Sequence, residues 1–196
     1  MKINALFAGC VFAAVVAMPA AAQTTIYTAN LTGSNEDEPN SSPGIGTATV
    51  TIDLDESTMR VQESFSGLTT NVIASHIHCC TAVPNAGAIG VATTTPTFTG
   101  FPSGVTMGEY DHTFDMLDPA SYNSPFLNAN GGTAQGAFDA LVAGMNSGRA
   151  YANIHTEMFQ GGEIRGFLAP IPEPETYAML LAGLAMISMV ARRRGV

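Results

Sequence analysis

The sequence predicts an all-β fold, an antiparallel Greek-key β-sandwich with one crossover helix. Charged residues make up only 12% of the 196 residues, and threonine and glycine are abundant in their place, which favours strands and turns. Polar and apolar side chains alternate over 47–54, as in a strand with one buried face. One stretch, 134–145, has instead the period of an amphipathic helix. Because 46% of the residues are apolar, the chain can bury a core, which excludes wholesale disorder.

Strands follow one another along the chain, separated by turns that are rich in Gly, Pro, Asn and Asp. The clearest pair is a hairpin, in which Asp55 and Glu56 stand in the turn between two alternating segments. The expected strands, with the hairpin given as one unit, are 24–31, 46–66, 72–78, 95–101, 110–114, 150–156 and 163–169.

The helical stretch has a start signal and a stop signal. Thr133 can cap its first turn, and Gly148 can end it. Its apolar face carries Phe138 and Leu141, which we expect to pack onto the core of the β-sandwich. The residues expected in that core are Ile52, Val61, Phe65, Ile77, Ile154 and Leu168.

The N-terminal segment, 1–22, has the pattern of a secretory signal peptide. Lys2 precedes an apolar run over 6–18, and the small residues 20–22 form a cleavage site for signal peptidase before Gln23. The protein is therefore expected to be exported.

The C-terminal segment, 172–196, combines a short Pro-Glu-Pro motif, an apolar stretch and an arginine cluster. The apolar stretch, 176–191, is marginal for a helix that spans a bilayer, and the arginines would hold its end in the cytoplasm. We expect transient anchoring in the membrane through this stretch. The motif residues are Pro172, Glu173, Pro174, Arg192, Arg193 and Arg194.

A single domain, 23–171, remains between the two end segments. It contains three arginines against 14 acidic residues, a formal net charge of −11. Too few cations are present to neutralise phosphates, so a nucleic-acid partner is excluded, while neutral glycans remain possible. We find no Gly-rich phosphate loop, no G-x-S-x-G motif and no acid pair suited to glycoside hydrolysis. A non-enzymatic role is therefore favoured.

Three histidines are candidate metal ligands. His76 and His78 flank Ile77 in an expected strand, so both imidazoles point to one face and Ile77 points to the other. If the strand that carries His155 is a neighbour, the three imidazoles converge, and neutral imidazoles suit copper, zinc, nickel or iron. The alternative is that they are ordinary exposed or hydrogen-bonded histidines. His112 has no partner at a useful spacing and is expected at the surface.

Cys79 and Cys80 directly follow the histidine pair and are the only cysteines of the domain. Three states remain open at this point: a disulfide between the two neighbours, thiolate ligation of a metal beside the histidines, and free or intermolecular thiols.

Other polar groups are expected to have no catalytic or metal-binding role. Glu163 and Arg165 flank Ile164, and we expect an ion pair on an exposed sheet face. The acidic stretch 36–38 lacks the ligand spacing of a calcium loop and is expected to be solvated.

The C-terminal segment resembles the PEP-CTERM sorting signal, because its Pro-Glu-Pro, apolar stretch and arginine cluster stand in the order typical of that family. The resemblance implies an exported protein whose tail is processed by an exosortase in bacteria that make exopolysaccharide. It also implies an inner-membrane anchor before processing, and the cell envelope, outer surface or extracellular matrix afterwards.

The domain resembles the CHRD family, named from chordin. The motif Ala74-Ser75-His76-Ile77-His78 looks like the first half of that domain, and Tyr151-Ala152-Asn153-Ile154-His155-Thr156 followed by Gly161-Gly162-Glu163-Ile164-Arg165-Gly166 looks like its closing signature. The resemblance implies a β-sandwich and an extracellular location. Cys79 and Cys80 depart from the small residues usual after the first motif. A weaker likeness to Cu,Zn superoxide dismutase rests on the H-x-H pair and the later histidine.

Two functional hypotheses follow. The first is a non-enzymatic binding module in the envelope or matrix, with an extracellular polysaccharide or protein partner. The alternative is a protein that binds copper or another transition metal, and is redox-active in one variant, through His76, His78 and His155.

Overall fold

The structure is a computed structural model, and it describes residues 23–172 and, within the C-terminal segment, residues 181, 183–185, 187–188 and 191–192. Eight strands join into one sheet, and their pairings are antiparallel. The strands are β1 (Thr24–Thr32), β2 (Ile45–Asp53), β3 (Thr58–Ser66), β4 (Val72–Cys79), β5 (Gly108–Asp115), β6 (Ala150–Thr156), β7 (Ile164–Phe167) and β8 (Ala169–Pro170).

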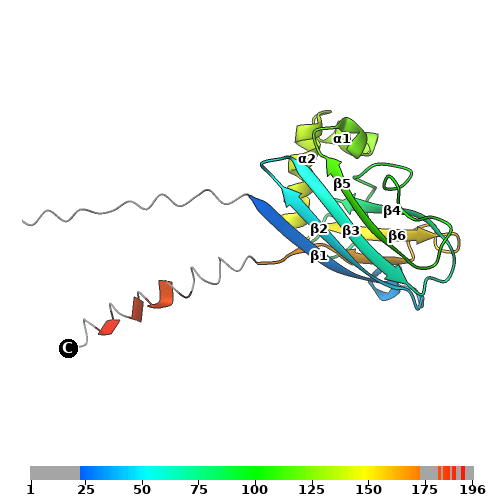
Figure 1. Ribbon diagram of the computed structural model, residues 1–196, viewed down its shortest axis with the longest axis horizontal. Helices are drawn as coiled ribbons and strands as arrows, with labels where there is room; N and C mark the ends of the chain where they lie inside the picture. Colours follow the sequence, from blue (N-terminus) through cyan, green and yellow to red (C-terminus); the bar gives the residue numbers. More distant parts are fainter. Residues whose placement is uncertain (1–22, 173–180, 182, 186, 189–190, 193–196) are drawn as a thin grey trace, which may run out of the picture.

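The sheet has the order β4-β6-β7-β1-β2-β3-β5, and β8 pairs with β1. It curls, so that β1, β2, β3 and β5 form one layer and β4 and β6 cross behind it (Figure 1). The all-β antiparallel prediction is confirmed. The two layers are the halves of one continuous sheet with the core between them, and the Greek-key connectivity stays a prediction.

The β2–β3 hairpin is closed by a short turn that aspartate stabilises. Asp53 Oδ1 accepts hydrogen bonds from the backbone N–H groups of Asp55 and Glu56, each at 3.0 Å. Ser57 adopts a left-handed conformation with φ of 52°, so one residue reverses the chain in the manner of a tight turn. The hairpin predicted over 46–66 is confirmed within one residue at its start.

Helix α2 (Ala134–Asn146) carries the chain from the β5 edge of the sheet back to β6. The side chain of Thr133 accepts a hydrogen bond from the Gly136 N–H and caps the helix, and Gly148 follows its end with φ of 65°. The predicted crossover helix is therefore confirmed. Two 3₁₀ turns (Gly33–Asn35 and Pro119–Ser121) and a short helix α1 (Ser124–Ala129) complete the elements.

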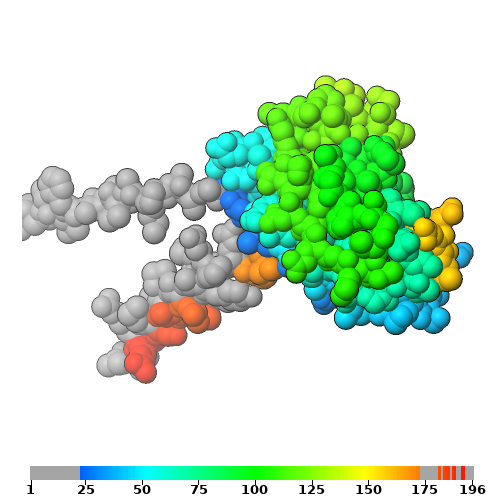
Figure 2. Space-filling model, turned by 45° about the vertical axis from the view of Figure 1, so that its right-hand side comes forward, coloured from blue at the N-terminus to red at the C-terminus, as the bar shows by residue number. Residues whose placement is uncertain are grey.

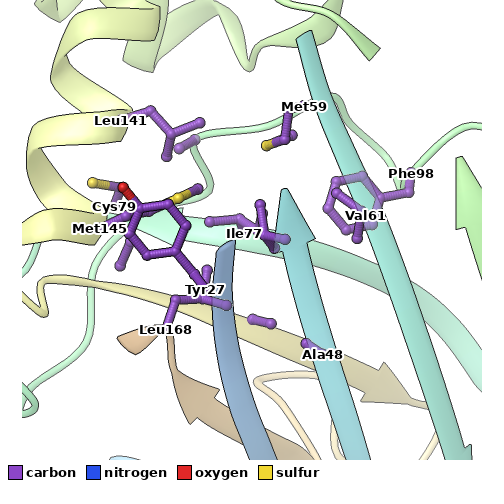
Figure 3. Packing of buried hydrophobic residues seen from close by; sticks show 14 of the residues in the cluster. Tyr27, Ala48, Met59, Val61, Ile77, Cys79, Phe98, Leu141, Met145 and Leu168 are labelled. Atoms are coloured by element: carbon purple, nitrogen blue, oxygen red, sulfur yellow. The ribbon is translucent and has the colours of Figure 1, made fainter. Parts of the chain in front are cut away.

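The core lies between the two layers and under α2. Figure 3 shows Ile77 between Val61 of the front layer and Leu141 and Met145 of the helix. All of these side chains are fully buried. Every residue predicted for the core is confirmed there, and so are Phe138 and Leu141 of the helix. The predicted core residues are Ile52, Val61, Phe65, Ile77, Ile154 and Leu168.

The strand predicted over 95–101 is wrong. These residues form bends that cross the edge of β4, although Phe98 and Phe101 still enter the core. Pro96 has no N–H to give to a strand ladder, and Gly100 turns the chain with φ of 76°. The predicted final strand, 163–169, is divided into β7 and β8, because Leu168 turns inward between them.

Both ends of the domain lie at the same side. Tyr27 of β1 pairs with Pro170 of β8, and the Ile171 N–H donates to the Ile26 carbonyl at 2.8 Å. In Figure 2 the blue start of β1 and the orange end of the domain lie together accordingly. The signal peptide predicted over 1–22 lies outside the described residues, as do Glu173, Pro174, Arg193 and Arg194 of the tail. In the described part of the chain, no helix is long and apolar enough to cross a membrane.

Candidate metal centre

The pairing of β4 with β6 brings three histidines together. His76 and His78 share one face of β4, while Ile77 between them points into the core. β6 runs antiparallel beside β4 with Asn153 opposite His76 and His155 opposite Ala74, so His155 lies diagonally from His76 on the same face. The ligand atoms that these histidines offer all lie within 4.8 Å of one another.

A backbone carbonyl fixes the tautomer of each imidazole. His76 Nε2 lies 2.7 Å from the Pro96 oxygen, His78 Nδ1 lies 2.8 Å from the Ile89 oxygen, and His155 Nδ1 lies 2.9 Å from the Gln160 oxygen. Because a carbonyl oxygen can only accept, each of these nitrogens carries the proton. The other nitrogen of each neutral ring is therefore left with its lone pair.

These lone pairs have no donor. His78 Nε2 and His155 Nε2 lie 3.4 Å apart, and each can only accept. The buried His76 Nδ1 has no hydrogen-bond partner among the described residues. In each of the three rings, one nitrogen is unprotonated and the other donates to a carbonyl. Metal-binding histidines in proteins adopt this arrangement.

Burial keeps the three rings neutral. The exposed fractions of His76, His78 and His155 are 6%, 7% and 7%. Loss of hydration lowers the pKa of His76 and of His78 to about 4, against the opposing effect of their carbonyl partners. The pKa of His155 is lowered for the same reason. Neutral imidazole is the form that binds a metal ion, so these rings need not lose a proton to do so at neutral pH.

An aromatic and cationic stack borders the histidines. The Tyr151 ring lies parallel to His78, with the ring centroids 4.8 Å apart, and its hydroxyl donates to the Ile89 carbonyl at 3.2 Å. The Arg165 guanidinium covers the other side of Tyr151, 4.8 Å from the ring centre. Ile89 thus receives hydrogen bonds from both His78 and Tyr151, which ties the rings to one loop.

A cleft of about 550 Å³ opens beside this stack. Its walls come from the loop after β1, from β6, and from the loop between β6 and β7, and they include Glu36, Tyr151, Asn153, Gln160 and Arg165. Since Gln160 also binds His155, the cleft reaches the edge of the histidine cluster.

Of two polar predictions near the cleft, the ion pair between Glu163 and Arg165 is wrong, and the solvated acidic stretch is wrong at Glu36 but confirmed at Asp37 and Glu38, which are exposed. Glu163 and Arg165 do not pair on an exposed face, because both are buried. Arg165 instead lies 3.7 Å from the Glu36 carboxylate and donates to the Asn35 and Gly87 carbonyls. Glu36 of the stretch predicted to be solvated is therefore buried, and burial raises its pKa to about 7, although Arg165 opposes this.

Glu163 has a structural role, in which it binds the loop before β2 and the loop after β3. It accepts hydrogen bonds from the hydroxyls of Ser42 and Thr156 and from the Thr69 N–H. Burial acts to raise its pKa, but these donors prevail and hold the pKa below the ordinary value. Glu163 thus ties the 42–44 and 67–70 segments to the end of β6.

Cys79 and Cys80 form a disulfide with each other. Their sulfurs lie on the opposite face of β4 from the histidines, against Gly144 of α2, and Figure 3 shows Cys79 beside Met145. Of the three states left open by the sequence, the structure has the disulfide, and the metal-ligand cluster in the described part of the chain contains neither sulfur.

The remaining histidine, His112, lies half-buried on β5 between Tyr110 and Phe114, outside the cluster. The carbonyls of Ile89, Pro96 and Gln160 were not found from the sequence. Every residue type carries a backbone carbonyl, so no sequence signal marks these three positions.

Comparison with known proteins gives two family matches. A family model described as CHRD domain matches residues 27–168, and one described as PEP-CTERM protein-sorting motif matches residues 170–194. No curated protein and no solved structure matches. The histidines, Tyr151, Asn153 and Arg165 all fall inside the first match, and the end of β8 marks its boundary with the second.

Proposed function

This chain belongs to the CHRD domain family, and from that premise we propose that it is an envelope protein whose domain is a non-enzymatic binding module for a transition-metal ion, in the first place copper. The ligands are His76, His78 and His155. The C-terminal PEP-CTERM motif indicates export, sorting toward the cell envelope with the tail held in the membrane, and processing by an exosortase. Association with exopolysaccharide or an extracellular matrix is a further part of the proposal.

The observation that carries the metal site is the set of three buried imidazoles, which offer ligand atoms within 4.8 Å of one another and whose free nitrogens have no donor among the described residues. Buried polar atoms in proteins nearly always have a partner, and an unpaired one costs about 1–3 kcal/mol. A metal ion would satisfy all three at once, whereas a proton or a water between two of them would leave the third unpaired. The carbonyls bound to the opposite nitrogens support this, because they orient the rings as in known metal centres.

The donor type favours copper among the candidate ions. Imidazole nitrogen suits copper, zinc, nickel and iron, and copper(II) stands highest in the general order of affinity for divalent ions. No carboxylate joins the cluster in the described residues, which argues against magnesium, calcium and manganese. An extracellular polysaccharide or protein partner of the module stays a prediction, as does redox activity of the bound metal.

The metal content of the exported protein, purified without a histidine tag, tests this function. We expect close to one equivalent of copper by plasma mass spectrometry after incubation with the metal and gel filtration. The His155→Ala variant should retain less than about a tenth of it. His112→Ala is the matched control, because that imidazole lies outside the cluster, and it should bind like the unmodified protein. Equal metal content in both variants would remove the proposal.

A further inference from the structure

The geometry points to a centre that prefers monovalent over divalent copper: His76, His78 and His155 form a buried, three-coordinate, wholly neutral ligand set that is suited to Cu(I). This inference rests on the proposed function, since it concerns the same site, and it adds the charge state of the ion. Four features of the described residues carry it, namely the number of donors, their charge, their burial and their spacing.

The number of donors is three. In the described part of the chain, no Asp, Glu or Cys joins the cluster, and the disulfide keeps both sulfurs on the other face of β4. Copper(II) prefers a tetragonal set of four or more ligands, and structural zinc sites have four. Copper(I), with a filled d shell, has no such geometric demand and is stable with three nitrogen ligands.

The donors bring no negative charge to the ion. A copper ion bound by three neutral imidazoles keeps its whole charge, +1 or +2, at a place where the rings are only 6–7% exposed. The cost of taking an ion out of water rises with the square of its charge, so a divalent ion loses about four times as much hydration free energy as a monovalent one.

A cation borders the cluster. Arg165 lies over Tyr151, whose ring in turn stacks on His78, and this cation acts on His78. Glu36 and Asp37 face Arg165 from the loop after β1, at 3.7 Å and 3.8 Å. Their carboxylates therefore compensate Arg165 and are not ligands of the cluster. None of these charged groups is a ligand, so the donors that meet the charge of the ion are all neutral.

The spacing fits a trigonal arrangement. Metal–nitrogen bonds of about 2.0–2.1 Å place two nitrogens of a trigonal set about 3.5 Å apart. His78 Nε2 and His155 Nε2 already lie 3.4 Å apart. His76 offers a ring nitrogen within the 4.8 Å that spans the cluster, so a shift of that ring toward the other two would complete the set.

Competition titrations test the preference directly. The exported protein is titrated with Cu(I) under anaerobic conditions against bathocuproine disulfonate, and with Cu(II) against nitrilotriacetate. A third titration uses Zn(II) against nitrilotriacetate. We expect a Kd for Cu(I) at least 100-fold below that for Cu(II). At 59 mV for each factor of ten, this raises the reduction potential of the bound ion by about 120 mV above that of free copper. A Cu(II) or Zn(II) affinity equal to or above the Cu(I) affinity overturns the inference and leaves the metal site intact, whereas no binding of any of the three ions overturns both.

A pair of variants of equal size separates charge from shape. His155→Glu supplies an anionic ligand, while His155→Gln supplies a neutral one of similar length. We expect the ratio of the two Kd values to move toward Cu(II) by at least tenfold in His155→Glu relative to His155→Gln. Circular dichroism of each variant verifies that the fold is retained, and His78→Glu against His78→Gln repeats the test at the second ligand. An unchanged ratio in pairs that fold would show that charge does not set the preference.

Discussion

The two faces of the β4–β6 pair are both buried, but they are built in opposite ways. The inner face carries Ile77, Ala152 and Ile154, which are fully buried among apolar side chains. The outer face carries His76, His78 and His155, which are 6–7% exposed under loops. Burying apolar groups stabilises a fold, whereas burying acceptors without donors costs free energy. The apolar inner face is therefore explained by its contribution to stability, whereas the unpaired acceptors of the outer face indicate a ligand.

The largest effect is expected on the inner side, at the helix that covers the core. Phe138 of α2 is 2% exposed, and Phe138→Ala should lower the free energy of unfolding by about 3–5 kcal/mol through lost burial and a cavity. Urea denaturation measures it. A loss below about 1 kcal/mol would show that the helix does not belong to the inner core.

An ionisable group on the inner side gives the next effect. Glu63 of β3 is buried beside Ser75, whose hydroxyl donates to it at 2.9 Å, and burial raises its pKa to about 8. Between about pH 4.5 and pH 8 the folded protein keeps a proton that the unfolded chain releases. The free energy of unfolding should therefore fall with rising pH by roughly 1 kcal/mol per unit.

The Glu63→Gln variant should lack this part of the slope and be more stable than the unmodified protein at pH 8. Glu36, with a pKa raised to about 7, contributes a slope of the same sign in both proteins, so the difference between them isolates Glu63. Parallel stability curves for the two proteins over pH 5–8 would contradict the prediction.

The contact between the disulfide and α2 gives a smaller effect. A Cβ at Gly144 would collide with the sulfurs of both Cys79 and Cys80. Glycine to alanine inside a helix ordinarily stabilises by up to about 1 kcal/mol, but Gly144→Ala should destabilise by about 1–3 kcal/mol because of overpacking. Gly161→Ala is the control, since a Cβ there meets nothing within 4 Å, and it should change thermal stability little. A stabilised Gly144→Ala would argue against this packing.

The smallest effect on stability is expected on the outer face. His155→Gln loses the hydrogen bond to the Gln160 carbonyl, which is worth about 1 kcal/mol, and it relieves the facing lone pair of His78. Its free energy of unfolding should stay within about 1 kcal/mol of the unmodified protein, while copper uptake falls. Loss of both stability and uptake to the extent expected for Phe138→Ala would remove the distinction between the faces.

Most of the fold could be predicted because strand side chains repeat with a period of two. That period assigned Ile77 to the core and its two histidine neighbours to the other face, and the helical period placed Phe138 and Leu141. It failed over 95–101, where aromatic residues suggested a strand but Pro96 cannot take part in a ladder. Phe98 is buried all the same, which shows that burial alone does not require regular structure.

The candidate site could be predicted in its ligands and not in its surroundings. His155 could be predicted as the third ligand because its motif placed it in a strand. The structure shows that this strand, β6, is the neighbour of β4. The partner of Arg165 was missed because Glu36 lies about 130 positions away in the chain, in a loop whose path no local pattern encodes. The carbonyls that orient the imidazoles were missed because every residue type carries one, so no side chain marks them in the sequence.

The pairing of β8 with β1 determines which end of the domain lies next to the C-terminal segment, the tether of the domain. Arg165 lies opposite Thr32 and Pro170 lies opposite Tyr27, so the cleft is separated from the tail by five positions of β1, about 17 Å of strand. While the tail is held in the membrane, the domain hangs from the pole at which its two ends meet (Figure 1). The cleft, which Arg165 lines, then lies toward the other end of β1 from the tether. Removal of the tail would free the domain without altering the cleft.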